Sequence, residues 1–312
     1  MNAENALPII VTAGSSYLDV DAYACCVALK ELFLLQGTDA IAYSPAECNY
    51  SVPLSMINAA SLAPKLPSNI DPKTSRYVIA DVSDPDYLDS SVPLQQIVAV
   101  YDHHVGFEAY WSNKLGDSAV IEFVGSAATL VYLEWKKYCL QDKIKRSTAL
   151  MLIAAILDNT LNLLSSNTTE EDIRAFDELC KAANVDEKWC AAYFTEVQHN
   201  IESNLKKAIC GDVKHIQSSI LPAQVSQICI WNADAIIGKL PKTGEFFGGS
   251  DDWMINLIDI RQRCSYFVCP NASRRKGLES VFGVRFDTDV AKAPKMYLRK
   301  ELIKFVNDKI GG

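Results

Sequence analysis

The stretch Ile97-Val98-Ala99-Val100-Tyr101-Asp102-His103-His104 decides the expected fold. Its apolar, largely β-branched half runs directly into three ionisable residues. Such a run is typical of a buried strand in a parallel sheet, and open α/β folds bind their ligands at the carboxyl ends of these strands. The whole chain has 4 histidines, and two of them are adjacent here. We therefore expect Asp102, His103 and His104 to lie at a functional site.

Carboxylates end other apolar segments in the same way. Asp19 and Asp21 follow the first apolar segment, Asp81 follows Tyr77-Val78-Ile79-Ala80, and Asp158 interrupts a strongly apolar helical stretch. One aspartate before a helix commonly serves as its N-cap, but two in one turn leave a carboxylate for another purpose. Imidazole and several carboxylates form a ligand set for a hard or borderline divalent ion such as Mn²⁺, Mg²⁺ or Co²⁺.

Strands and helices alternate along the first part of the chain, which is the pattern of a doubly wound parallel sheet. The expected strands lie at residues 7–13, 39–43, 77–84, 97–101 and 119–123. The expected helices lie at 22–35, 54–60, 124–135, 146–157 and from 168, where Thr168 and Glu171 form the expected capping pair. After Gly211 we expect strands at 228–231, 253–260 and 266–269 and helices at 275–281 and 299–306.

The predicted fold class is therefore α/β, with a parallel doubly wound sheet in a large N-terminal domain and a smaller C-terminal α/β domain. A chain of 312 residues exceeds the size at which one hydrophobic core stops growing. We place the N-terminal metal-binding catalytic domain at residues 1–190, a helical linker at 191–212 and the C-terminal substrate-binding domain at 213–312.

Composition limits the classes of partner. A net charge of -8 argues against a nucleic-acid or membrane-surface binder, because phosphate-rich partners would be repelled. No apolar run is long enough to span a membrane, and the first residues lack the pattern of a secretory signal. The 10 cysteines are scattered, which favours free thiols in a reducing compartment. We expect a cytoplasmic protein.

The acid-bearing segments, taken in order, resemble the four motifs of the DHH phosphoesterase superfamily. These segments are Asp19-Val20-Asp21, Asp81, Asp102-His103-His104 and Asp158-Asn159-Thr160. The Gly-Gly-Gly-His signature of nucleic-acid-directed members is absent, since Ser250 and Asp251 follow Gly248-Gly249. Instead, the segment around Arg299-Lys300 is similar to the Ser-Arg-Lys-Lys segment of family II inorganic pyrophosphatases. The chain also resembles their prune-like exopolyphosphatase relatives.

The resemblance implies roles for individual residues. Asp21, Asp81, His103 and Asp158 would bind one metal ion, and Asp19, Asp81 and Ser15 the other. His104 would contact the substrate or protonate the leaving group, with Asp102 orienting it, and Arg299 and Lys300 would bind phosphate. Ser15 stands where family II pyrophosphatases have a histidine, which implies a weaker first metal position and a preference for Mg²⁺ over Mn²⁺. The family's inter-domain lysine has no assignable match.

The implied activity is hydrolysis of phosphoanhydride bonds in pyrophosphate or short-chain polyphosphate by a two-metal-activated water, with Mn²⁺ or Mg²⁺. Two alternatives remain open: a phosphodiesterase or nucleotidase acting on a small nucleotide, and a non-catalytic phosphate-binding regulatory module. Ser15 keeps the second alternative open. The expected partner is a small phosphate-containing substrate. A homodimer is a further possibility, because exposed edge strands of the first domain could pair two copies of the chain.

Overall fold

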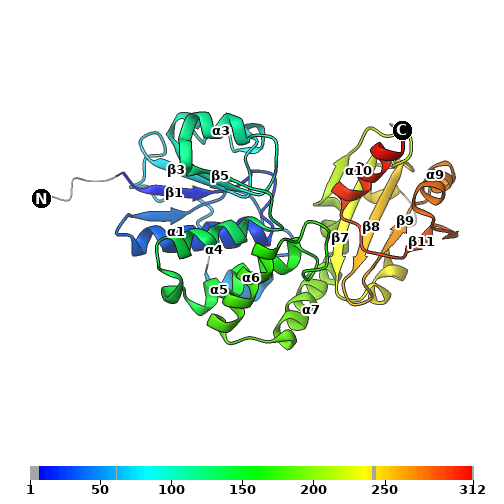
Figure 1. Cartoon of the computed structure of the whole chain (residues 1–312). Coiled ribbons are helices and arrows are strands. Elements are labelled where there is room, and N and C mark those ends of the chain that lie inside the picture. The colour runs from blue at the N-terminus through cyan, green and yellow to red at the C-terminus, as the bar shows by residue number, and fades with distance from the viewer. Residues whose placement is uncertain (1–6, 61, 241–243, 311–312) are drawn as a thin grey trace, which may run out of the picture. The chain divides into compact units, whose positions relative to one another are not determined.

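The computed structural model describes residues 7–60, 62–240 and 244–310. The chain divides into two compact units, residues 1–190 and 191–312, each with its own β-sheet (Figure 1). The two units are described separately. None of the described helices has both the length and the apolar character that crossing a lipid bilayer requires.

Unit 1 contains a five-stranded sheet in which every strand pairs in parallel. The strands are β1 (Ile9–Thr12), β2 (Ala40–Ala42), β3 (Arg76–Ala80), β4 (Ile97–Asp102) and β5 (Ala119–Ile121), in the order β2-β1-β3-β4-β5. The strand order reverses between β1 and β3, and in open α/β sheets such a switch point is where ligands bind. The predicted parallel, doubly wound sheet is confirmed.

Helices cover both faces of this sheet. In Figure 1, α3 lies over one face and α1 and α4 over the other. The helices are α1 (Val20–Leu35), α2 (Leu54–Ala59), α3 (Glu108–Leu115), α4 (Ala127–Lys137), α5 (Arg146–Asn159), α6 (Glu170–Ala183) and α7 (Glu187–Ser203), which crosses into unit 2. Every residue of β1 is buried, as expected for a central parallel strand with both faces covered.

The predicted cap of α6 is wrong by one residue. The N-cap is Thr169, whose side chain and that of Asp172 form a reciprocal capping box, in place of Thr168 and Glu171. The hydroxyl of Thr168 instead lies 3.1 Å from that of Ser165 in the preceding turn. The shift brings Asp172 to a buried position, while Glu171 is exposed.

Unit 2 contains a mixed six-stranded sheet. Its strands are β6 (Val213–His215), β7 (Gln224–Ile230), β8 (Trp253–Asp259), β9 (Cys264–Val268), β10 (Phe286–Asp287) and β11 (Val290–Ala293), in the order β10-β11-β9-β8-β7-β6. Only β7 and β8 among these pair in parallel. The sequence pattern missed β6, β10 and β11, which are too short to show a clear period of two.

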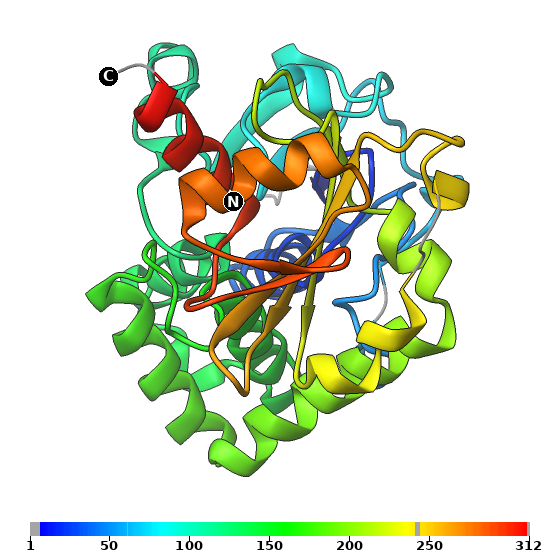
Figure 2. The same cartoon turned by 90° about the vertical axis from the view of Figure 1, so that its right-hand side faces the viewer.

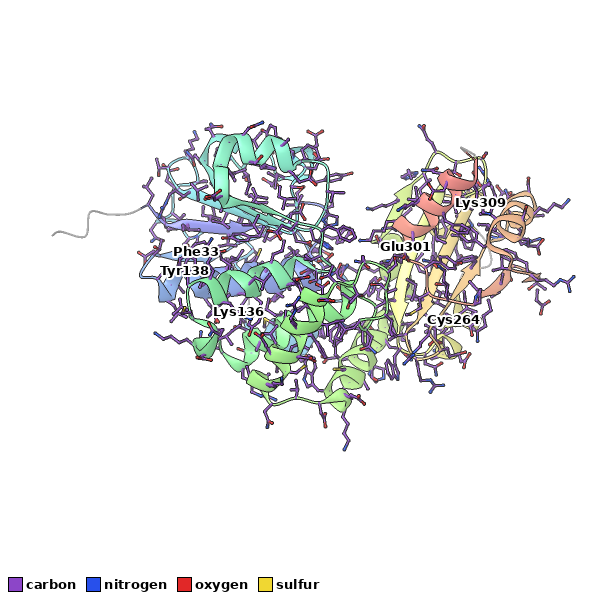
Figure 3. The ribbon with its side chains drawn as sticks, in the orientation of Figure 1. Phe33, Lys136, Tyr138, Cys264, Glu301 and Lys309 are labelled. Carbon is purple, nitrogen blue, oxygen red and sulfur yellow. The ribbon has the colours of Figure 1, made fainter. Side chains whose placement is uncertain are left out.

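Two helices pack on one face of this second sheet. α9 (Ala272–Phe282) and α10 (Arg299–Ile310) lie side by side over the strands (Figure 2), while α8 (Leu205–Cys210) precedes β6. Leu278 of α9 and Leu302 of α10 share one core with Met254 and Phe267 of the sheet. Figure 3 shows that α10 begins near Glu301 and continues to Lys309. Unit 2 therefore has a hydrophobic core of its own.

Candidate functional site

Three predicted site residues meet at the carboxyl edge of the first sheet. Among the described residues, Asp81, His103 and His104 each offer a ligand atom within 4.8 Å of the others. Asp81 directly follows β3, and the two histidines directly follow β4. Because β3 and β4 are parallel neighbours, their carboxyl ends deliver these side chains to the same place.

Asp81 occupies the centre of this cluster in a strained conformation. Its φ of 58° lies in the left-handed region, which non-glycine residues seldom adopt outside functional sites or turns. Its backbone N–H donates to the carbonyl of Tyr101 at 2.8 Å, which holds it against β4. Its Oδ1 atom is buried and accepts no hydrogen bond from the described residues. Burial and the carboxylates of Asp21, Asp19 and Asp102 raise the pKa of Asp81 well above its ordinary value.

His103 presents its Nε2 atom to the carboxylates. Its Nδ1 lies 3.1 Å from the carbonyl oxygen of Val124, which can only accept, so Nδ1 carries the proton. The Nε2 atom of the neutral ring then has a lone pair, 3.5 Å from Asp81 Oδ1 and 4.0 Å from Asp21 Oδ2. A lone pair facing two carboxylates is unfavourable unless a proton or a metal ion lies between them.

Asp21 is held by the first residues of α4. Its carboxylate accepts hydrogen bonds at 2.9 Å from the Ser126 hydroxyl and from the backbone N–H groups of Ala127 and Ala128. The positive end of the helix dipole also favours a carboxylate there. Even so, burial and the nearby Asp19 raise the pKa of Asp21 to about 7. The sequence gives no sign of this anchoring, because Asp21 lies more than a hundred residues from the residues that bind it.

Asp19 serves as the N-cap of α1 and also faces the cluster. Its Oδ1 accepts a hydrogen bond at 3.0 Å from the N–H of Ala22. Burial raises the pKa of Asp19, and this rise is opposed by that hydrogen bond, by His104 and by contact with the Asp81 carboxyl. Capping and proximity to the cluster are therefore compatible in this residue.

His104 is oriented by its neighbour Asp102. The Nδ1 atom of His104 lies 2.8 Å from Asp102 Oδ1, and the His104 backbone N–H donates to the same oxygen at 3.1 Å. The side chain of His104 is 60% exposed, whereas that of Asp102 is fully buried. Burial raises the pKa of Asp102, but the hydrogen bonds and charge of His104 outweigh it, and the net shift is downward.

Ser15 and Asp158 are less closely tied to the cluster. The hydroxyl of Ser15 donates to the carbonyl of Tyr87 at 3.0 Å. Asp158 lies half-buried in the last turn of α5 and does not belong to the group of three ligand atoms within 4.8 Å of one another. Their assignment as metal ligands stays a prediction.

The donor set at the cluster fits a hard or borderline divalent ion. It consists of carboxylate oxygens and an imidazole nitrogen, and the buried, unpartnered Oδ1 of Asp81 is an acceptor without a donor. Cys25, which sequence analysis did not assign to the site, donates its thiol to Asp21 at 3.5 Å. Burial and the carboxylates raise the pKa of Cys25 well above its ordinary value, so it remains a neutral thiol and a poor metal ligand.

The two predicted phosphate-binding cations lie in unit 2. Arg299 is 8% exposed, and its Nη1 donates to the carbonyls of Asp212 at 2.6 Å and Val225 at 3.1 Å. Its Nη2 donates to Asp212 Oδ1 at 2.6 Å. Lys300 is exposed. These three bonds hold the guanidinium group within unit 2, and burial leaves little of the side chain accessible to a phosphate.

Comparisons with known proteins agree with the motifs and the fold. The chain is 23% identical over 295 residues to a Lactobacillus acidophilus protein named as a manganese-dependent inorganic pyrophosphatase, which covers 91% of this chain and 93% of that protein. A similarly named Bacillus pumilus protein is 24% identical over 294 residues, with the same coverage of both chains. No family model matches the chain.

Solved structures extend this agreement to the fold. A Methanococcus jannaschii structure assigned to the family II inorganic pyrophosphatases superimposes with a TM-score of 0.64 at 17% identity, covering 97% of this chain and all (100%) of that one. The chain is thus similar in sequence to proteins named as inorganic pyrophosphatases and in fold to one assigned to family II. An exopolyphosphatase-related protein from Bacteroides fragilis has a TM-score of 0.52 at 11% identity, over 98% of this chain and 92% of its own. The comparisons support the predicted DHH branch, and the predicted two-domain α/β fold is confirmed.

Proposed function

We propose that the protein hydrolyses phosphoanhydride bonds in inorganic pyrophosphate or short-chain polyphosphate with Mn²⁺ or Mg²⁺. The observation that carries this proposal is the cluster of Asp81, His103 and His104, in which a buried carboxylate oxygen has no hydrogen-bond donor within the described part of the chain. The names of the relatives, manganese-dependent inorganic pyrophosphatases, support the same activity.

The residues that would hold the metal ions surround Asp81. We assign Asp21, Asp81, His103 and Asp158 to one ion and Asp19, Asp81 and Ser15 to the other. Divalent ions supply charge neutralisation for phosphate oxygens and lower the pKa of water. The protein contributes a fixed tautomer, since the bond from His103 to Val124 keeps Nε2 directed toward the carboxylates.

His104 is assigned to the proton transfer. Asp102 accepts the Nδ1 proton of His104 and fixes the orientation of the ring, while the side chain remains accessible to a substrate. A protonated His104 can donate from Nε2 to the oxygen of the leaving phosphate, which stabilises the charge that develops when the P–O bond breaks. We further propose that Lys300 and Arg299 of unit 2 bind phosphate, with the exposed Lys300 as the more accessible cation. The cytoplasmic location, the homodimer and the roles of the two domains stay predictions.

A small nucleotide is the second candidate substrate. Val105 and Phe123 follow β4 and β5 at the edge that carries the cluster, and they are 65% and 66% exposed. Exposed apolar and aromatic side chains beside a phosphate site can pack against a nucleobase. For this reason a phosphodiesterase or nucleotidase activity is the second candidate function.

The experiment compares phosphate release from four substrates by the purified full chain: pyrophosphate, tripolyphosphate, a longer polyphosphate and a dinucleotide. Each is tested with Mn²⁺ and with Mg²⁺, and Asp81→Asn serves as the variant without the central carboxylate. We expect pyrophosphate or tripolyphosphate to be the best substrate and Asp81→Asn to be inactive. A preference for the dinucleotide would replace the proposal with the second candidate. Metal binding without turnover of any substrate would favour a regulatory module.

A further inference from the structure

Asp172 is a fully buried carboxylate to which the proposed function gives no role. It lies in the first turn of α6, where its Oδ2 accepts hydrogen bonds from the Thr169 N–H at 2.7 Å and hydroxyl at 2.8 Å. The capping box is complete with the bond from the Thr169 N–H and the bond at 3.3 Å that the Asp172 N–H donates to the Thr169 hydroxyl. Asp172 makes two others, to residues more than forty positions earlier in the chain.

These additional contacts reach the turn between β5 and α4. Asp172 Oδ2 accepts a hydrogen bond at 2.8 Å from the N–H of Gly125, and Oδ1 accepts one at 2.6 Å from the Thr129 hydroxyl. A Cβ atom on Gly125 would lie 2.5 Å from Thr160 Cγ2 and 2.7 Å from Asp172 Oδ2. A glycine therefore stands where the backbone must approach this carboxylate.

The turn that Asp172 holds also holds two of the proposed metal ligands. We name residues 124–128 the anchor loop. At its start, the Val124 carbonyl accepts from His103 Nδ1, and at its end, Ser126 to Ala128 donate three hydrogen bonds to Asp21. The contact with Asp172 lies between these two, at Gly125. A displacement of the anchor loop would therefore move His103 and Asp21 together.

Two further contacts connect the anchor loop with neighbouring helices. The Asn167 side-chain amide donates to the carbonyls of Gly125 at 3.3 Å and Asn159 at 3.4 Å, which links the loop to the end of α5 that bears Asp158. Farther along α4, Lys136 (labelled in Figure 3) pairs with Glu178 of α6 at 2.8 Å. Asn167 thus links the anchor loop to α5, and Lys136 links α4, which follows the loop, to α6.

We propose that Asp172 is a positioning residue for the metal site, acting through the anchor loop on Asp21 and His103. This inference rests on the proposed function only in taking these two side chains as metal ligands. Asp172 itself touches neither the ligands' reacting atoms nor substrate, so its effect is on geometry. Partners of this kind typically alter metal affinity by about 10- to 100-fold when they are removed.

The test measures Mn²⁺ affinity of the folded full chain by isothermal titration calorimetry, well below the melting temperature. Asp172→Ala removes the carboxylate that accepts hydrogen bonds from Gly125 and Thr129, and we expect the Mn²⁺ dissociation constant to rise about 10- to 100-fold. Asp172→Asn should recover most of this loss, because its amide oxygen can accept from Gly125 and its NH₂ can donate to the Thr129 hydroxyl.

The matched control is Asp259→Ala in unit 2. Asp259 is also fully buried, and it also accepts backbone N–H bonds, from Ala233 at 2.8 Å and Gln262 at 2.6 Å. Both alanine variants should lower the melting temperature, but Asp259→Ala should leave Mn²⁺ affinity unchanged. If Asp172→Ala destabilises the protein with no change in Mn²⁺ affinity, Asp172 is merely structural and the proposal is overturned.

A milder variant keeps the proposal testable if Asp172→Ala does not fold. Thr129→Val preserves the shape of the side chain but removes the hydroxyl that donates to Asp172 Oδ1, so a few-fold weakening of Mn²⁺ binding is expected. With Asp172→Ala unfolded, unchanged Mn²⁺ affinity in Thr129→Val would overturn the proposal. Failure of the unmodified protein to bind Mn²⁺ would instead overturn the proposed function.

Discussion

The Nδ1 atom of His104 lies 2.8 Å from Oδ1 of the buried Asp102, while the rest of the imidazole is open to solvent. A buried carboxylate thus fixes the orientation of an exposed, titratable ring beside the acidic cluster. Because Asp102 engages Nδ1, Nε2 is the ring nitrogen of His104 that remains for another contact.

The first prediction concerns His104. His104→Gln removes the proposed proton donor, and kcat for pyrophosphate should fall about 100- to 10,000-fold, the range that general acid–base catalysis contributes. Mn²⁺ affinity should change little by comparison. The control is His199→Gln, an exposed histidine of α7, which should behave like the unmodified protein in a phosphate-release assay. Equal activity of the two variants would contradict the assignment of His104.

The second prediction concerns the carboxylate cluster without metal. Burial and mutual repulsion raise the pKa of Asp81 well above 3.8 and that of Asp21 to about 7. A group with a raised folded-state pKa stabilises the fold below its unfolded pKa and loses this contribution as pH rises. The melting temperature of the metal-free protein should therefore decrease as the pH rises from about 4 to about 7, because these buried carboxyl groups become charged. Mn²⁺ added at pH 7 should reverse the fall, as a thermal-shift series would show.

The third prediction concerns Asp81→Asn in the same measurement. Asparagine tolerates the left-handed backbone of this position and carries no charge. The metal-free variant should be more stable than the unmodified protein at pH 7 by at least about 1–3 kcal/mol, because it removes a buried charge that lies beside the carboxylates of Asp21 and Asp19. It should also lose the stabilisation by Mn²⁺. A variant that is less stable than the parent and still responds to Mn²⁺ would show that Asp81 is not the centre of the site.

The fourth prediction concerns Ser15. Ser15→His places an imidazole at the position where the family II inorganic pyrophosphatases that this chain resembles have one. The variant should bind Mn²⁺ at least about tenfold more tightly, which corresponds to about 1.4 kcal/mol of binding free energy. Ser16→His is the control, since Ser16 is the exposed neighbour. If calorimetry gives the same affinity for both variants, Ser15 does not stand at a metal position.

The fifth prediction separates the two cations of unit 2. Arg299→Ala leaves Asp212 without its buried ion-pair partner, and unit 2 should lose about 3–5 kcal/mol of stability. Lys300→Ala changes an exposed residue and should alter stability by no more than about 0.5 kcal/mol, while raising KM for pyrophosphate. Hydrogen exchange of the β7 amides reports stability, and steady-state kinetics report KM. Equal protection of β7 in both variants would contradict a structural role for Arg299.

The sequence by itself determined the parallel sheet and the identity of the acidic cluster. Continuous apolar segments such as Ile97–Tyr101 are stable as strands when both faces of the sheet are buried. The ionisable residues that follow these parallel strands then lie together at the carboxyl edge of the sheet. For this reason Asp81, His103 and His104 could be placed together before their coordinates were known.

Only the tertiary structure decided how these side chains are held. The hydrogen bonds from the anchor loop to Asp21, the contact of Asp172 with Gly125 and the burial of Arg299 against Asp212 each join residues at least forty positions apart. Such contacts leave no periodic pattern, because they depend on how finished elements pack rather than on local preference for helix or strand. The capping box of α6 shows the same limit, since Thr168 and Thr169 are equivalent until packing selects the residue whose partner, Asp172, can be buried.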